Sequence, residues 1–118
     1  MSQTDSLDLF DQIRELRRRD ERRSRAEYSD VLTLLLVAKL SEESNEAMEL
    51  YRRSRGWGTD GVTNAEPTDV YDELCAAIMA GFVALDRICP DARVHWEHYL
   101  AYGYERAARE NKDAAANS

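Results

Sequence analysis

The sequence is poor in residues that break or bend a polypeptide. It has five glycines and two prolines among 118 residues, and almost no stretch alternates apolar and polar residues as a half-buried strand does. These shortages argue against a sheet with many tight turns. The apolar residues recur instead at helical spacing, so we expect an all-α fold.

Cysteine, long apolar runs and an excess of positive charge are also scarce or absent. Cys75 and Cys89 match no zinc-binding spacing, and the longest uncharged run of the second half, Leu74 to Leu85, is too short to span a bilayer. The net charge of −7 disfavours DNA binding. Because no secretory signal is recognised in the sequence, we expect a cytoplasmic protein with reduced thiols that binds neither DNA nor membranes.

The apolar pattern predicts four helices in a single domain comprising residues 1–118. We expect an ordered core over about 6–110 and a polar, disordered tail over about 111–118. The expected landmarks are an N-cap at Ser6, a second helix over about 26–54, a main loop from Gly56 to about Pro67, a third helix over about 68–88 and a fourth starting at Pro90. The expected core edge of the third helix is Leu74, Ile78, Gly81, Leu85 and Ile88.

The segment from Arg17 to Arg25 carries six arginines and two acidic residues. We interpret it as a solvated helix end or connector. The alternative is a basic lip that attracts phosphate groups, and the sequence does not decide between the two.

Two of the expected helices place glutamates on an apolar face. Leu36, Glu43 and Leu50 are spaced by seven residues, so they lie nearly on one line, and Glu46 follows Glu43 by one turn. Glu73 has small apolar residues at helical-neighbour positions. Because an acid on such a face is costly to bury unless it is paired or bound to a metal, we expect a shared divalent-cation site. The alternative is a solvated acidic face, which Glu43 fits badly.

These acidic segments resemble the MazG-like family of all-α nucleoside triphosphate pyrophosphohydrolases. The resemblance covers about Val31 to Arg93 and is carried by three strings: 39–46 (KLSEESNE), 72–78 (DELCAAI) and 84–93 (ALDRICPDAR). The family motif is Glu-x-x-Glu on one helix and Glu-x-x-Asp on the next. Glu43 and Glu46 match the first half and Glu73 begins the second, but Ala76 stands where the family has its Asp.

The resemblance implies Mg²⁺-dependent cleavage of a nucleoside triphosphate into a monophosphate and pyrophosphate, with Mn²⁺ as the alternative ion. It makes Glu43, Glu46 and Glu73 the metal ligands. Glu42 and Glu43 are the candidates for orienting or deprotonating the attacking water. The candidates for contacting the substrate are Lys39, Arg52, Arg53 and Arg55, which would reach phosphates, and Trp57, which is either a lid over the core or a platform for a nucleobase.

Ala76 has three competing explanations. A neighbouring acid, Asp69 or Asp72, replaces the missing ligand; or the protein binds nucleotides and hydrolyses them poorly; or an Asp was deliberately changed to Ala to trap a substrate complex. Loss of the ligand is expected to weaken metal binding and to slow turnover or abolish it.

The resemblance also implies a MazG-like four-helix bundle completed by oligomerisation, as a homodimer or homotetramer. The run from Val31 to Ala38 is apolar nearly all round, which fits an additional covering subunit. The rival interpretation is a non-catalytic helical module for protein interaction or nucleotide sensing. It would use the aromatic fourth helix or the Arg17–Arg25 segment.

Overall fold

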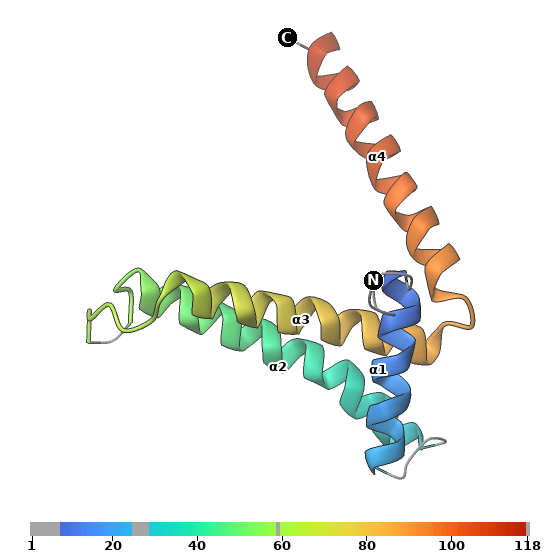
Figure 1. Ribbon diagram of the computed structural model, residues 1–118. Coiled ribbons are helices and arrows are strands. Elements are labelled where there is room, and N and C mark those ends of the chain that lie inside the picture. The colour runs from blue at the N-terminus through green and yellow to red at the C-terminus, as the bar shows by residue number, and fades with distance from the viewer. Residues whose placement is uncertain (1–7, 25–28, 59, 118) are drawn as a thin grey trace, which may run out of the picture. The chain divides into compact units, whose positions relative to one another are not determined.

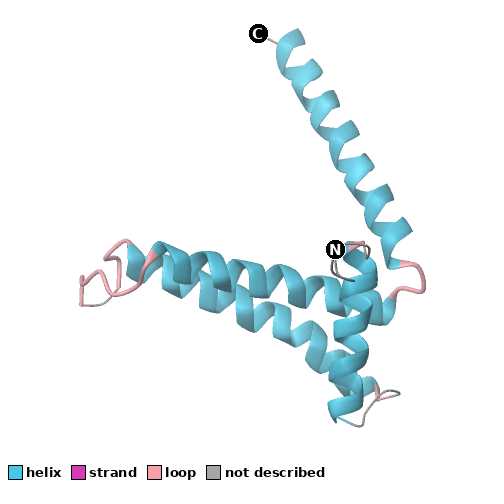
Figure 2. Ribbon diagram, in the orientation of Figure 1, coloured by secondary structure: helices cyan, strands magenta, loops and turns pink. Residues whose placement is uncertain are grey.

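The computed structural model describes residues 8–24, 29–58 and 60–117. This part of the chain contains four helices and no strand (Figures 1 and 2): α1 (Leu9–Ser24), α2 (Asp30–Ser54), α3 (Pro67–Ile88) and α4 (Ala92–Ala116). The prediction of an all-α fold is confirmed. No described helix combines the length and the apolar character needed to cross a membrane.

The chain divides into two compact units, Met1–Ile88 and Cys89–Ser118. In the first unit, α2 and α3 run antiparallel and side by side as a long hairpin (Figure 1). α1 crosses the hairpin near the end where α2 begins and α3 stops. The second unit consists of α4 and the residues that flank it.

Local capping fixes two of the helix starts. The Ser29 hydroxyl accepts a hydrogen bond from the Leu32 N–H (3.2 Å) at the start of α2. The Asp91 carboxylate accepts one from the Val94 N–H (3.5 Å), which makes Asp91 the N-cap of α4. The prediction that Pro90 occupies the first position of this helix was therefore wrong by two residues, because a side-chain acceptor begins the helix better than a proline does.

Other predicted boundaries differ less or fall outside the description. Ser6 and the expected start of the second helix near residue 26 lie outside the described residues. α4 continues through Ala116, over most of the predicted disordered tail. The three alanines after Asp113 have the highest helix propensity of any residue type, which accounts for this extension.

The packed face of α3 is its small-residue face. Its buried apolar residues are Val70, Ala77, Ala80, Val83 and Ala84. The predicted core edge is largely wrong, since Leu74, Ile78 and Ile88 are each about half exposed or more. Small side chains let α2 approach closely, and a Cβ added at Gly81 would lie 3.6 Å from a Leu40 methyl carbon. Close approach of the two helix backbones therefore outweighs the size of the apolar side chains in choosing the buried face.

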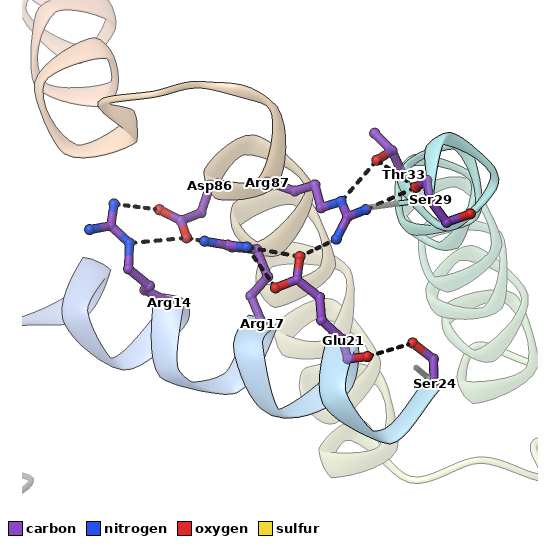
Figure 3. Close-up of polar contacts among 8 residues, drawn as sticks. All are labelled: Arg14, Arg17, Glu21, Ser24, Ser29, Thr33, Asp86 and Arg87. Atoms are coloured by element: carbon purple, nitrogen blue, oxygen red, sulfur yellow. Dashed lines mark hydrogen bonds and ion pairs between the residues drawn. The ribbon is translucent and has the colours of Figure 1, made fainter. Parts of the chain in front are cut away.

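α1 is held to α3 by apolar contacts and by buried ion pairs. Phe10 is buried and meets the Phe82 ring edge-on, with centroids 5.4 Å apart. The fully buried Asp86 carboxylate accepts hydrogen bonds from Arg14 (3.1 Å) and Arg17 (2.7 Å) of α1 (Figure 3). These bonds satisfy a charge that would otherwise be costly to bury.

The same network continues to α2 through Glu21 and Arg87. Glu21 accepts hydrogen bonds from Arg17 and Arg87, and Arg87 also donates to the Thr33 hydroxyl (2.8 Å) and the Ser29 carbonyl (2.9 Å) (Figure 3). Interpreting this arginine-rich segment as a solvated connector was therefore wrong for Arg17 and Glu21, because both make buried contacts between helices.

Candidate functional site

The central feature of the hairpin is a cluster of three glutamates. Glu43 and Glu46 come from α2, and Glu73 comes from the facing part of α3. Each offers one carboxylate oxygen, and these oxygens all lie within 4.8 Å of one another. Among the described residues, these three glutamates are the acidic, histidine or cysteine side chains that lie close enough together to hold a metal ion. The predicted convergence of these three acids from two helices is therefore present in the fold.

The positions of these glutamates follow from helical geometry. Glu43 lies on the face of α2 that packs against α3, between Leu36 and the buried Ala47. Glu46 lies one turn further along and is exposed, whereas Glu43 and Glu73 are half-buried. The cluster therefore opens to solvent on the Glu46 side.

The three carboxylates repel one another when all are ionised. The pKa of Glu73 is raised, first because the Glu43 carboxyl lies in position to share a proton with it, then because of burial and the negative charges of Glu43 and Glu46. Glu73 Oε2 is shielded from solvent and accepts no hydrogen bond from any described residue. A cation or a proton would relieve this repulsion. The donor set consists of hard oxygens, which suit Mg²⁺.

A pocket of about 180 Å³ adjoins the cluster. Glu43 belongs to both features, and Lys39 lies one turn before it at the pocket. α1 contributes Asp20, a residue that sequence reasoning did not select. In the sequence, Asp20 looks like an ordinary solvated residue of an arginine-rich helix. It lies at the pocket because α1 crosses the hairpin there.

The predicted phosphate-binding arginines lie apart from the glutamates, at the loop end of the hairpin. Arg53 donates to the Asn64 side chain (3.0 Å), and Arg55 lies over the Trp57 ring, 5.5 Å from its centroid. Arg52 is exposed and within 3.9 Å of Glu49. The contacts of Arg53 and Arg55 are with residues of the loop, whereas that of Arg52 lies within α2. Whether any of the three arginines reaches a phosphate stays a prediction.

Trp57 does not cover the core as a lid. Its ring meets Tyr51 edge-on, with centroids 5.7 Å apart, and 55% of the residue is exposed. The structure thus removes the first of its two interpretations and leaves an aromatic surface at the loop. Glu42, the other residue assigned to water activation, is exposed and lies outside the cluster of three.

Asp69 and Asp72, the two acids considered as substitutes for an aspartate at position 76, are not part of the cluster. Asp69 accepts a hydrogen bond from the Glu66 N–H (3.0 Å) at the start of α3, and Asp72 is exposed. Ala76 itself lines the pocket beside Glu43.

Comparison with known proteins gave no relative for this chain: no protein-family model, no curated protein and no solved structure matches it.

Proposed function

We propose that the protein is a Mg²⁺-dependent nucleoside triphosphate pyrophosphohydrolase of MazG-like type, impaired by Ala76. The observation that carries the proposal is the convergence of Glu43, Glu46 and Glu73 from two antiparallel helices. Two further observations support it. The pKa of Glu73 is raised by the adjacent Glu43 carboxyl, by burial and by the negative charges of Glu43 and Glu46, and a pocket shares Glu43 with the cluster.

In the proposed reaction, a water oxygen attacks the α-phosphorus, the bond from that phosphorus to the α–β bridging oxygen breaks, and pyrophosphate leaves. Bound Mg²⁺ would neutralise phosphate charge and make the water more acidic. The role of Glu43, Glu46 and Glu73 is to hold the ion, and a carboxylate beside it, Glu42 or Glu43, accepts the proton of the water. Lys39, one turn before Glu43, holds a phosphate oxygen.

The proposed assembly is a homodimer or homotetramer. α2 carries an apolar surface on the side away from α3, and Val31, Leu34 and Leu35 are between 59% and 68% exposed. Contiguous apolar surface of this kind is typical of interfaces. A second copy that covers these residues would complete a bundle that α1, α2 and α3 leave open.

Isothermal titration calorimetry with nucleoside triphosphates, with and without Mg²⁺, tests the proposal. We expect binding only with Mg²⁺, and we expect Glu73→Gln to weaken it by roughly 10–100-fold, because a ligand is lost. The matched control is Glu66→Gln, which neutralises an exposed acid just before α3, outside the cluster. The absence of any metal-dependent heat, or equal heats for the two variants, would refute the site.

The competing proposal is a non-catalytic helical interaction module. α4 favours it, since Tyr99, Tyr102 and Tyr104 are each about half exposed or more, and Trp96 stacks on Tyr99. Thermal unfolding separates the two proposals. A melting temperature that rises with Mg²⁺ and nucleotide together favours the hydrolase, and one that responds to neither favours the interaction module.

A further inference from the structure

The pocket between α1, α2 and α3 has the size and lining of a site for one ring system. Leu36, Met79 and Val83 give it apolar walls, and Ala76 and Ala80 leave space between them. Its volume of about 180 Å³ is below the roughly 300–1,000 Å³ of sites for drug-sized ligands. A single nucleobase is therefore a better fit than a whole nucleotide.

Two charged residues of opposite sign also line this pocket. Asp20 comes from α1 and Lys39 from α2, and both are exposed. Neither forms a hydrogen bond or an ion pair with any residue that the structure describes. The Asp20 carboxylate can therefore accept hydrogen bonds from a ligand, and it has no donor of its own to offer.

The order of residues along α2 gives the bound molecule a direction. Leu36, Lys39 and Glu43 follow one another at spacings of three and four residues and all line the pocket. The seven helical steps from Leu36 to Glu43 span about 10 Å, which is comparable to the distance from a base to the phosphates of the same nucleotide. Along α2, the pocket is therefore lined first by an apolar side chain, then by a cation and then by an acid that belongs to the glutamate cluster.

We infer that the pocket receives the base of a nucleotide whose phosphates lie at the glutamate cluster, and that Asp20 selects bases carrying an exocyclic amine. Cytosine and adenine carry such an amine, which can donate to a carboxylate, and guanine carries one at a different ring position. Uracil and hypoxanthine place a carbonyl oxygen where cytosine and adenine carry the amine, and two acceptors then face each other. The inference rests on the proposed function, since the cluster must hold the phosphates.

Calorimetric titration of the full chain in Mg²⁺ tests this selectivity with three probes: CTP, UTP and inorganic tripolyphosphate. We expect CTP to bind about tenfold more tightly than UTP. The Asp20 carboxylate would accept a hydrogen bond from the cytosine amine, whereas it would face a carbonyl oxygen of uracil and gain no hydrogen bond. Asp20→Asn should remove most of that difference, because an amide can both donate and accept. Its affinity for tripolyphosphate, which has no base, should be unchanged.

Glu15→Gln is the matched control, since it neutralises another exposed acid of α1 outside this pocket. It should keep the preference for CTP. Equal affinities for CTP and UTP in the unsubstituted chain, a preference for UTP, or a CTP preference that survives in Asp20→Asn would overturn the role of Asp20. In those cases Mg²⁺-dependent triphosphate binding would leave the proposed function standing. If no triphosphate binds in Mg²⁺, the proposed function fails and this inference fails with it.

Discussion

At the scale of single residues, Ala76 is the position on which catalysis would depend. It follows Glu73 by three residues on α3 and lines the pocket beside Glu43. An aspartate there would add a fourth carboxylate on the side of the cluster that faces the pocket. Neither Asp69 nor Asp72 belongs to the cluster, so no described acid already supplies that charge.

We therefore expect Ala76→Asp to raise Mg²⁺-dependent pyrophosphate release by roughly 10–100-fold, the usual effect of a ligand or its support. A coupled assay of pyrophosphate release measures it. Ala76→Asn is the matched control, because it has the same shape without the charge and should leave the rate low. Equal rates for Asp and Asn would show that the added carboxylate takes no part in the reaction.

Loss of the Asp86 carboxylate should cost stability. Its buried carboxylate accepts hydrogen bonds from Arg14 and Arg17, and the Arg17 side chain is itself only 16% exposed. Asp86→Asn should lower the free energy of unfolding by about 2–4 kcal/mol, since it removes the buried negative charge that Arg14 and Arg17 both contact and leaves Arg17 with Glu21 alone. Urea denaturation measures the change. Glu110→Gln, which breaks the exposed pair with Arg106, should change it by no more than about 0.5 kcal/mol.

The same carboxylate predicts a pH dependence. Burial alone would raise the pKa of Asp86, but the hydrogen bonds and positive charges of Arg17 and Arg14 outweigh it, and the pKa lies below the ordinary 3.8. A lowered folded-state pKa gives stability that is present above the unfolded-state pKa and lost as the pH falls through the folded-state pKa. The stability gap between the unsubstituted chain and Asp86→Asn should thus be constant near neutral pH and close below 3.8. A gap that closed above pH 5 would contradict this assignment.

At the scale of elements, the start of α2 couples helix capping to the packing of α3. Ser29 caps α2 through its hydroxyl, and its carbonyl accepts a hydrogen bond from Arg87. The backbone must hold this position for both bonds to form.

Ser29→Ala should lower the free energy of unfolding by about 1 kcal/mol, because the Leu32 N–H loses its acceptor. Ser41→Ala is the control, an exposed serine inside α2, where alanine should be neutral or slightly stabilising because of its helix propensity. Chemical denaturation of both variants provides the comparison. Equal effects at the two positions would mean that the cap contributes nothing.

At the scale of the whole molecule, the apolar outer face of α2 predicts self-association. Leu34 is 68% exposed, and the charge of a lysine there would have to be buried if a second copy covers this face. We expect the unsubstituted chain to sediment as a dimer or tetramer and Leu34→Lys to sediment as a monomer.

Glu15→Lys, which puts the same lysine at an exposed polar position of α1, should keep the mass of the assembly. Analytical ultracentrifugation measures all three proteins. A monomeric mass for the unsubstituted chain would exclude the proposed assembly, and an oligomer that persists in Leu34→Lys would move its interface elsewhere.

The helical class and the convergence of the glutamates could be predicted from the amino-acid sequence. Both depend on local geometry: helical periodicity gives the helices, and the seven-residue spacing of Leu36, Glu43 and Leu50 puts Glu43 on the face that packs against α3. Two helices that are joined by one loop can pack against each other in only a few ways. The sequence was therefore enough to predict that Glu73 lies near Glu43 and Glu46.

The buried face of α3, the attachment of α1 and the lining of the pocket could not be predicted in this way, because they depend on the three-dimensional packing of the helices. The large residues Leu74 and Ile78 looked like core, but close backbone approach selected the alanine face. Asp20 and Asp86 looked like ordinary charged residues, until the crossing of α1 brought one to the pocket and paired the other with arginines. Spacing along the chain encodes the face of a helix. It does not encode the angle at which a distant helix crosses that face, because that angle is set by the shapes and charges of both surfaces together.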